Sequence, residues 1–227
     1  MRRFLIDTDT ASDDAVALIM ALKNPHVRVE AITVVAGNVP LSQAVENALY
    51  TLEVAGRSGV PVYPGAAGPL ERELCTAQDV HGEDGLGDLG QPRAKQRPEA
   101  EPAADAIVRC ISGAPGEVTL VTIGPLTNVA LALRRDSSIA AKVKEVYVMG
   151  GTAGAVGNVT PVAEYNIWTD PEAAREVFRS GMPITMVGWE IAVRHGVLTD
   201  HEVDRLMEIG TCEATFAVEC NRILRQH

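Results

Sequence analysis

The chain contains no apolar run long enough to cross a membrane, which takes about 20 such residues in a helix. Its first apolar run, residues 4–6, is also too short for the core of a secretory signal peptide, and acidic residues follow it directly. These absences argue against a membrane protein and against a signal peptide, so we expect no membrane partner.

Basic residues are scarce relative to acidic ones. The sequence has 20 Lys and Arg against 30 Asp and Glu, which gives a formal net charge of -10 at pH 7. The basic residues are scattered, and the only adjacent Arg pairs are Arg2-Arg3 and Arg134-Arg135. A surface of this kind repels polyanions, so the composition argues against a nucleic-acid partner.

Cysteine is sparse as well and shows no metal-binding spacing. The four cysteines are Cys75, Cys110, Cys212 and Cys220, and none belongs to a CxxC pair. We interpret them as small buried apolar residues of a reduced, cytoplasmic protein rather than as disulfides or zinc ligands.

What the sequence does contain is enough apolar residues, 46%, for the core of one α/β domain spanning residues 1–227. Continuously apolar segments, typical of strands buried on both faces, fall at residues 4–6, 27–35, 60–63, 118–123, 145–149 and 184–187. Predicted helices, two of them N-capped by Ser12 and Asp170, fall at residues 13–23, 42–55, 103–112, 126–135, 171–179, 199–209 and 212–224. This alternation predicts an open, mostly parallel sheet with helices on both faces.

Four carboxylates follow the first apolar segment within eight residues, namely Asp7, Asp9, Asp13 and Asp14. They lie between a predicted strand and a predicted helix, at the sheet edge where open α/β folds bind ligands. Crowded acids repel one another unless a cation lies among them, and oxygen ligands favour a hard divalent ion. The alternative is a solvated turn that merely caps the helix, but a cap needs one acid rather than four.

Polar residues also follow several other predicted strands. Asn38 comes after the second strand, Thr127-Asn128 after the strand at 118–123, and Glu164-Tyr165-Asn166 after the loop that leaves the strand at 145–149. Each alone is more typical of a turn than of a binding site. Because the carboxyl ends of parallel strands meet at one edge, the group together predicts one active-site pocket.

Seven segments of the chain match the motif pattern of a single enzyme family. In order along the chain they are Asp7-Thr8-Asp9 with Asp13-Asp14-Ala15, Val35–Asn38, Asp79–Gly82, Gly124–Asn128, Met149–Gly151, Gly157–Asn166 and Asp170–Ala174. Together they resemble the nucleoside hydrolases, the inosine-uridine preferring family. The resemblance implies a Rossmann-like fold and Ca²⁺-dependent hydrolysis of ribonucleosides to free base and ribose, in nucleoside salvage. It also implies a homodimer or homotetramer, and it leaves the preferred base open.

The resemblance assigns the acids to a metal and a base. Asp9 and Asp14 would coordinate Ca²⁺ together with the backbone carbonyl of Ile123, and ribose hydroxyls and a water would complete its shell. Asp13 would be the general base that takes the proton of the attacking water. Asp7 would support this shell by hydrogen bonding rather than touch the metal.

The same resemblance assigns the substrate contacts. Four side chains would hold the ribose hydroxyls: Asn38, Asn158, Glu164 and Asn166. Met149 would line the sugar pocket. His81 lies in residues 64–102, a long segment with little periodicity of the kind that is usually functional or disordered. On sequence alone it would be a surface histidine, but the motif around it places it near the nucleobase.

The chain departs from the family pattern in two places. The family usually carries another metal-binding Asp near its end, often preceded by a His that protonates the leaving base, and no such stretch precedes Gln226-His227. We therefore expect a domain that lacks the family's last helices, binds Ca²⁺ weakly, hydrolyses nucleosides poorly, and exposes apolar surface near residues 212–224. Trp189-Glu190 stands where many relatives have Leu-Asp, and we interpret it as a pair at a strand end.

Two rival functions remain open at this point. The start Phe4–Thr10 also resembles the haloacid-dehalogenase phosphatases, in which Asp7 would be the nucleophile and Asp9 the acid/base with Mg²⁺. That family needs a later acidic motif, and Gly87-Asp88 has no following acid at suitable spacing. The second rival is a protein that binds Ca²⁺ and ribose without catalysis. Release of free base with and without a chelator separates the three.

Overall fold

The computed structural model of the chain describes residues 1–154 and 156–226, and it contains a six-stranded sheet. Every paired strand in it is parallel to its neighbours. In chain order the strands are β1 (Arg2–Thr8), β2 (Val27–Val34), β3 (Val62–Pro64), β4 (Val118–Thr122), β5 (Glu145–Met149) and β6 (Ile184–Val187). The predicted sheet is therefore confirmed, and each predicted strand is present within a few residues of its expected bounds.

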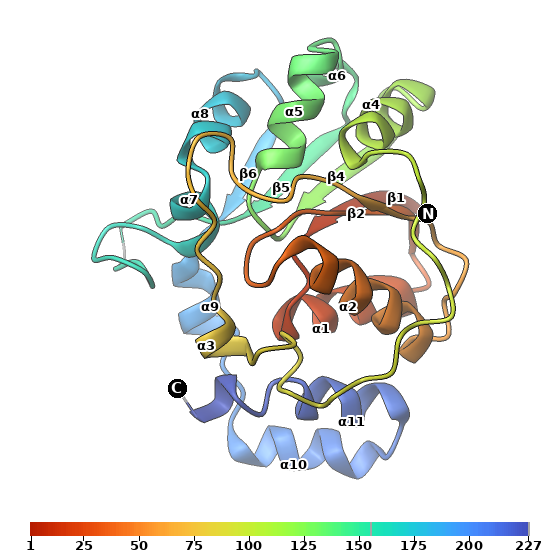
Figure 1. Cartoon of the computed structure of the whole chain (residues 1–227), viewed down its shortest axis with the longest axis vertical. Helices are drawn as coiled ribbons and strands as arrows, with labels where there is room; N and C mark the ends of the chain where they lie inside the picture. Colours follow the sequence, from red (N-terminus) through yellow and green to blue (C-terminus); the bar gives the residue numbers. More distant parts are fainter. Residues whose placement is uncertain (155, 227) are drawn as a thin grey trace.

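Helices cover both faces of this sheet, as predicted (Figure 1). They are α1 (Ser12–Lys23), α2 (Leu41–Val54), α3 (Gln78–His81), α4 (Ala103–Gly113), α5 (Thr127–Arg135), α6 (Ile139–Lys142), α7 (Tyr165–Thr169), α8 (Pro171–Arg179), α9 (Trp189–His195), α10 (Asp200–Ile209) and α11 (Cys212–Glu219), with a 3₁₀ turn at Leu224–Gln226. One core cluster joins the sheet to α4, α5 and α8, and a second joins it to α1, α2 and α11. Neighbouring residues of β1 supply both cores, because Leu5 packs in the first and Ile6 in the second.

The order of the strands places a crevice at the end of β1. The sheet runs β3-β2-β1-β4-β5-β6, so the chain reverses its direction of winding between β1 and β4. Asp7 of β1 is in register with Thr33 of β2 and Thr122 of β4. The connections that leave β1 and β4 diverge to opposite faces at this point, which is where open α/β sheets bind ligands.

Several local predictions were wrong. Ser12 does not cap α1, because the N-cap residue is Ala11 and no side chain there bonds the helix. Trp189 and Glu190 do not end a strand but begin α9. The short helices α3, α6, α7 and α9 were not expected, since four to seven residues carry too little periodicity to be recognised.

The expected exposure of apolar surface near residues 212–224 was also wrong. Phe216 of α11 and Cys220 directly after the helix are buried in the cluster with α1 and α2, and Val218 is buried as well. Seven exposed apolar residues lie on β6, α9, α10 and the connection between the two helices: Met186, Ile191, Val193, Val197, Leu198, Met207 and Ile209. Others, such as Met20, Val162 and Phe178, lie elsewhere. Cys75 and Cys212 are exposed rather than buried. In the described part of the chain, no helix is both long enough and apolar enough to span a bilayer.

Candidate active site at the carboxyl ends of β1 and β4

The four acids of the turn after β1 divide into a buried group and one exposed member. Asp7 and Asp9 are fully buried and Asp14 is nearly so. The side chain of Asp13 is 60% exposed. Because Asp13 and Asp14 are successive residues in the first turn of α1, their side chains leave the helix in different directions. One acid can therefore face a substrate while its neighbours remain inside.

The backbone of neighbouring loops packs tightly around the carboxylate of Asp9. Its Oδ2 accepts a hydrogen bond of 2.6 Å from the backbone N–H of Asn38, while its Oδ1 is buried without a partner among the described residues. Two glycines make this room, since a Cβ at Gly37 would lie 2.1 Å from Oδ2 and one at Gly124 2.8 Å from Oδ1. A buried carboxylate oxygen without a donor is costly unless something else satisfies it.

Threonines and an amide hold the other two buried acids. Thr8 donates to Asp14 Oδ2 at 2.6 Å. Asp7 Oδ1 accepts from Thr33 at 2.5 Å and from Asn128 Nδ2 at 2.9 Å, and its Oδ2 is unpartnered in the described structure. Hydrogen bonds thus hold Asp7 to the C-terminal end of β2 and to the first turn of α5.

Burial makes the ionised forms of these acids unfavourable. Loss of solvation raises the pKa of Asp7 to about 7 and that of Asp9 to about 7, against an ordinary value of 3.8. Burial, and then the nearby charges of Asp9 and Asp13, raise the pKa of Asp14 well above its usual range. Within the described residues the basic side chain that approaches this group is His81, whose Nδ1 lies 4.0 Å from Asp13 Oδ1 and which forms an ion pair only when protonated. The cluster therefore lacks a neutralising Lys or Arg in that part of the chain.

These observations fit a hard divalent cation. The donors are all oxygens, an oxygen of Asp9 is buried without a partner, and no basic side chain among the described residues competes for the place. Over the same residues, no three Asp, Glu, His or Cys side chains converge as a preformed cage. Asp9, Asp14 and backbone oxygen would thus provide only part of a shell that needs six to eight oxygens.

Asn166 joins two of the other predicted site residues. Its Nδ2 donates to the carbonyl oxygen of Ile123 at 3.0 Å and to that of Met149 at 3.2 Å, with Met149 Sδ at 3.3 Å. Ile123 directly follows β4 and Met149 ends β5. One amide therefore brings the ends of two strands together, and the Ile123 carbonyl keeps a second lone pair.

The remaining sugar-contact candidates all carry backbone contacts. Glu164 caps α7, with Oε1 accepting from Asn166 N at 2.9 Å and Oε2 from Gly151 N at 2.7 Å. Burial raises its pKa. Asn158 is exposed and its Oδ1 accepts from Tyr165 N at 2.8 Å. The carboxylate of Glu164 fixes the loop after β5, so a contact with ribose would be additional to this role.

His81 lies next to the acidic turn although it follows it by more than 60 residues. It ends α3, is 8% exposed, and its Nδ1 lies 2.8 Å from Ser12 Oγ. Burial lowers the pKa of its imidazole, opposed by the negative charges of Asp13 and Asp79. The long segment after β3 thus delivers a neutral imidazole to the candidate site.

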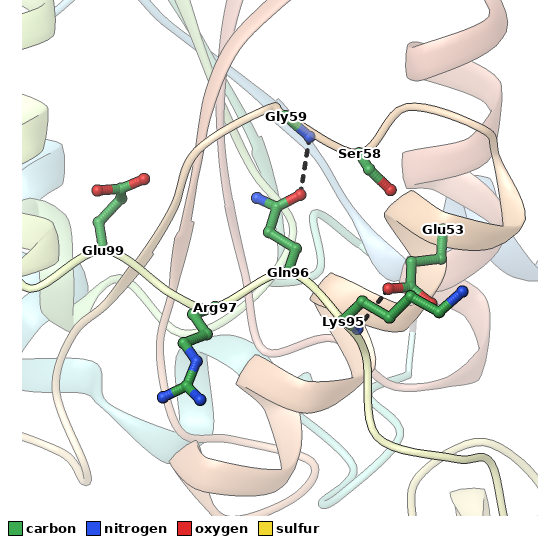
Figure 2. Close-up of a pocket in the computed structure, with 7 residues that line it drawn as sticks. All are labelled: Glu53, Ser58, Gly59, Lys95, Gln96, Arg97 and Glu99. Carbon is green, nitrogen blue, oxygen red and sulfur yellow. Dashed lines mark hydrogen bonds between the residues drawn. The ribbon is translucent and has the colours of Figure 1, made fainter.

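A surface hollow lies elsewhere in the molecule (Figure 2). It has a volume of about 830 Å³ and is lined by Glu53, Ser58, Gly59, Lys95, Gln96, Arg97 and Glu99. These residues lie around the C-terminal end of α2 and the segment that enters β3, and Gln96 Oε1 accepts from Gly59 N at 2.8 Å. The hollow therefore opens at the amino edge of the sheet, opposite the acids.

Three polar residues of the site were missed or misread in the sequence. The sequence predicts Ser12 as a helix cap and assigns no role to Thr33 or Asn47. Asn47 donates from Nδ2 to Thr10 O at 3.0 Å and to Asp84 O at 2.8 Å, which links the acidic turn to the segment after His81. A polar residue within an otherwise apolar strand or helix face was the available signal for Thr33 and Asn47.

The comparison with family profiles agrees with this geometry. The profile of the inosine-uridine preferring nucleoside hydrolases matches residues 4–227. Uridine nucleosidase 1 of Arabidopsis thaliana is 43% identical over 212 residues, which are 93% of this chain and 62% of the relative. A pyrimidine-specific ribonucleoside hydrolase of Shewanella sp. (strain ANA-3) is 42% identical over 96% of this chain and 68% of its own length. The chain thus spans about two thirds of these relatives.

Solved structures of nucleoside hydrolases also superpose closely on this chain. A plant nucleoside hydrolase superposes with a TM-score of 0.94 at 37% identity, over 99% of this chain and 71% of that one. A purine-preferring ribonucleoside hydrolase from Gardnerella vaginalis also reaches 0.94, at 30% identity, over 99% of this chain and 72% of that one. Of these four relatives, two are named for uridine or pyrimidines and one for purines, while all four are named as nucleosidases or nucleoside hydrolases.

Proposed function

This chain belongs to the inosine-uridine preferring nucleoside hydrolase family, and we propose that it hydrolyses the N-glycosidic bond of ribonucleosides to free base and ribose. The observation that supports this most strongly is that the turn after β1 holds both a buried carboxylate and an exposed one. Asp9 keeps a buried oxygen without a donor, while Asp13 presents a largely exposed carboxylate. A cation site beside a solvent-facing carboxylate suits hydrolysis at a sugar carbon, because the cation can activate a water and the carboxylate can take its proton.

We assign the metal as Ca²⁺, held by Asp9, Asp14 and the carbonyl of Ile123. When bound, Ca²⁺ supplies positive charge that orients the ribose diol and acidifies a water. Asp7 does not reach it in this assignment but fixes the ends of β2 and α5 through Thr33 and Asn128. The haloacid-dehalogenase alternative, in which Asp7 is the nucleophile, loses its basis because the family profile covers the chain from residue 4 onward.

The remaining chemistry comes from the chain's own side chains. Asp13 accepts the proton of the attacking water. Asn38, Asn158, Glu164 and Asn166 bind the ribose hydroxyls, Met149 packs on the sugar, and His81 meets the nucleobase. The sugar develops positive charge as the bond to the base lengthens, and the ionised acids beside it stabilise that charge.

We further propose that this is one nucleoside hydrolase domain of a cytoplasmic homodimer or homotetramer that acts in nucleoside salvage. The relatives named for uridine and for purines leave the base open, so uridine and inosine are both suitable substrates. The test measures by chromatography how much free base the protein releases over many turnovers, before and after a chelator is added. We expect turnover that stops with the chelator and returns with Ca²⁺. Binding of nucleoside with no release would show a binding protein instead.

A further inference from the structure

Ser12 and His81 form the closest contact between the acidic turn and the segment after β3. Ser12 Oγ and His81 Nδ1 are 2.8 Å apart, Ser12 is fully buried, and His81 is 8% exposed. The two residues are 69 positions apart in the chain. The contact therefore depends on the tertiary fold and fixes the ring relative to the turn.

Both partners are held from behind by backbone contacts. The carbonyl of Ser12 accepts from Asn221 Nδ2 at 3.4 Å and from the thiol of Cys220 at 3.5 Å. The backbone N–H of His81 donates to Ala77 O at 3.1 Å, and its carbonyl accepts from Gly87 N at 2.9 Å. These bonds fix the backbone of both residues, so the two side chains start from set positions.

The direction of this hydrogen bond decides which ring nitrogen carries the proton. A buried hydroxyl needs an acceptor, since an unpaired one costs free energy. Within the described residues, the acceptor available to Ser12 Oγ is His81 Nδ1. If the hydroxyl donates to Nδ1, the neutral ring carries its proton on Nε2.

The carboxylate of Asp13 favours the other tautomer of His81, but its effect is weaker than that of Ser12. Its carboxylate would favour a proton on Nδ1, yet it lies 4.0 Å away, beyond hydrogen-bond distance, and it is 60% exposed. Solvent screens such a charge strongly. The short contact with a buried hydroxyl therefore outweighs it.

We propose that Ser12 is a positioning residue whose hydroxyl donates to Nδ1 of His81 and thereby makes Nε2–H a hydrogen-bond donor to the nucleobase. The hydrogen bond with Ser12 is made at Nδ1, so the other ring nitrogen, Nε2, is the one left to meet a ligand. It would select bases that present an acceptor, a carbonyl oxygen or a bare ring nitrogen, and it would stabilise negative charge on the departing base. The inference rests on the proposed hydrolysis of nucleosides.

The tautomer can be measured without activity. The ¹⁵N resonances of the imidazoles separate a protonated ring nitrogen from a bare one, the chain has only 5 His, and loss of the signals in His81→Gln assigns them. In the wild-type chain we expect His81 with a proton on Nε2. Ser12→Ala should mix the two tautomers, and Ser12→Thr, which keeps the hydroxyl, should restore the wild-type pattern.

Ser42→Ala is the matched control, because Ser42 is an exposed serine in the first turn of α2. It should change nothing. A proton on Nδ1 in the wild-type chain, an unchanged ring in Ser12→Ala, or a Thr variant that behaves as the Ala variant would each overturn the proposal.

Kinetics then separate this inference from the function on which it rests. Ser12→Ala should lower kcat/KM for uridine or inosine about five- to tenfold, the effect of one lost hydrogen bond. It should spare p-nitrophenyl riboside, whose leaving group needs no donor. Equal losses on both substrates would overturn the role of Ser12 alone. Absence of hydrolysis in every variant would overturn the proposed function, whereas the tautomer result would stand.

Discussion

The amide nitrogen of Asn166 lies 3.0 Å from the carbonyl oxygen of Ile123 and donates a hydrogen bond to it. The first residue is a proposed ribose contact and the second a proposed metal ligand. The same amide also reaches the carbonyl of Met149, at 3.2 Å. The side chain of Asn166 therefore couples the proposed ribose contact to the position of the Ile123 carbonyl.

Asn166→Ala should raise the barrier to hydrolysis by about 1–3 kcal/mol, the cost of leaving a buried polar partner unpaired. The reason is the loss of the ribose contact and of the bond that aligns Ile123. We expect similar losses in kcat/KM for uridine and inosine, since ribose is common to both. A loss confined to one class of base would move Asn166 into the base pocket.

Asp14→Ala should weaken Ca²⁺ binding more than Asp7→Ala. Asp14 faces the turn, and Thr8 occupies only its Oδ2. Asp7 is buried below the turn and is held by Thr33 and Asn128. Calorimetric titration of Ca²⁺ into both variants gives the ranking. Equal loss of affinity in the two would contradict it.

The metal-free chain should lose stability as pH rises. The pKa of Asp9 is about 7 in the folded chain against an ordinary 3.8, so the stability that its protonated form confers is present below about pH 4 and is lost as pH rises to about 7. Added Ca²⁺ should reverse this loss at neutral pH, because it binds the ionised carboxylate.

Thermal unfolding in a chelator measures this effect. Asp9→Asn is the matched control, because its amide does not titrate and its difference from the wild-type chain reports Asp9 together with its influence on Asp14. The wild-type Tm should fall relative to the variant's between about pH 4 and about pH 7. A wild-type Tm that rises relative to the variant's over that range would contradict the account.

Arg222→Ala should loosen the segment that carries His81. Arg222 donates from its guanidinium to the carbonyls of Gly87 and Asp88, at 2.5 and 2.6 Å. Amide hydrogen exchange should speed up in residues 82–90, with little change in α4 on the far side of the sheet. Arg225→Ala serves as control, since Arg225 only approaches the fully exposed side chain of Asp200 at 3.7 Å. Equal exchange in both variants would contradict the bracing role.

The sequence was most informative where local pattern decides structure. The strands are largely apolar, so their positions along the chain and the acids after β1 could be predicted without knowledge of any long-range contact. Asp170 was also predicted correctly as the N-cap of α8, because the capping bond is local: Asp170 Oδ1 accepts from Ala173 N, three residues ahead.

The sequence was least informative where a partner lies far along the chain. A hydroxyl before an apolar helix looks like a cap, so Ser12 was misread, and its partner His81 is 69 residues away. Glu164 caps a helix of only five residues, which periodicity cannot reveal. Which acid faces solvent also depends on packing, and thus the exposure of Asp13 beside the buried Asp14 became visible only in the fold.

The most direct test of the account is Asp13→Asn, with Ca²⁺ binding and turnover measured on the same protein. The central claim is that Asp9 and Asp14 hold the metal while the exposed Asp13 takes the proton. Hydrolysis of p-nitrophenyl riboside is the suitable assay, because it depends least on protonation of the leaving group. We expect nearly unchanged Ca²⁺ affinity by calorimetry and a loss of about 10²- to 10⁴-fold in kcat. Loss of Ca²⁺ together with activity, or turnover that survives the substitution, would contradict the claim.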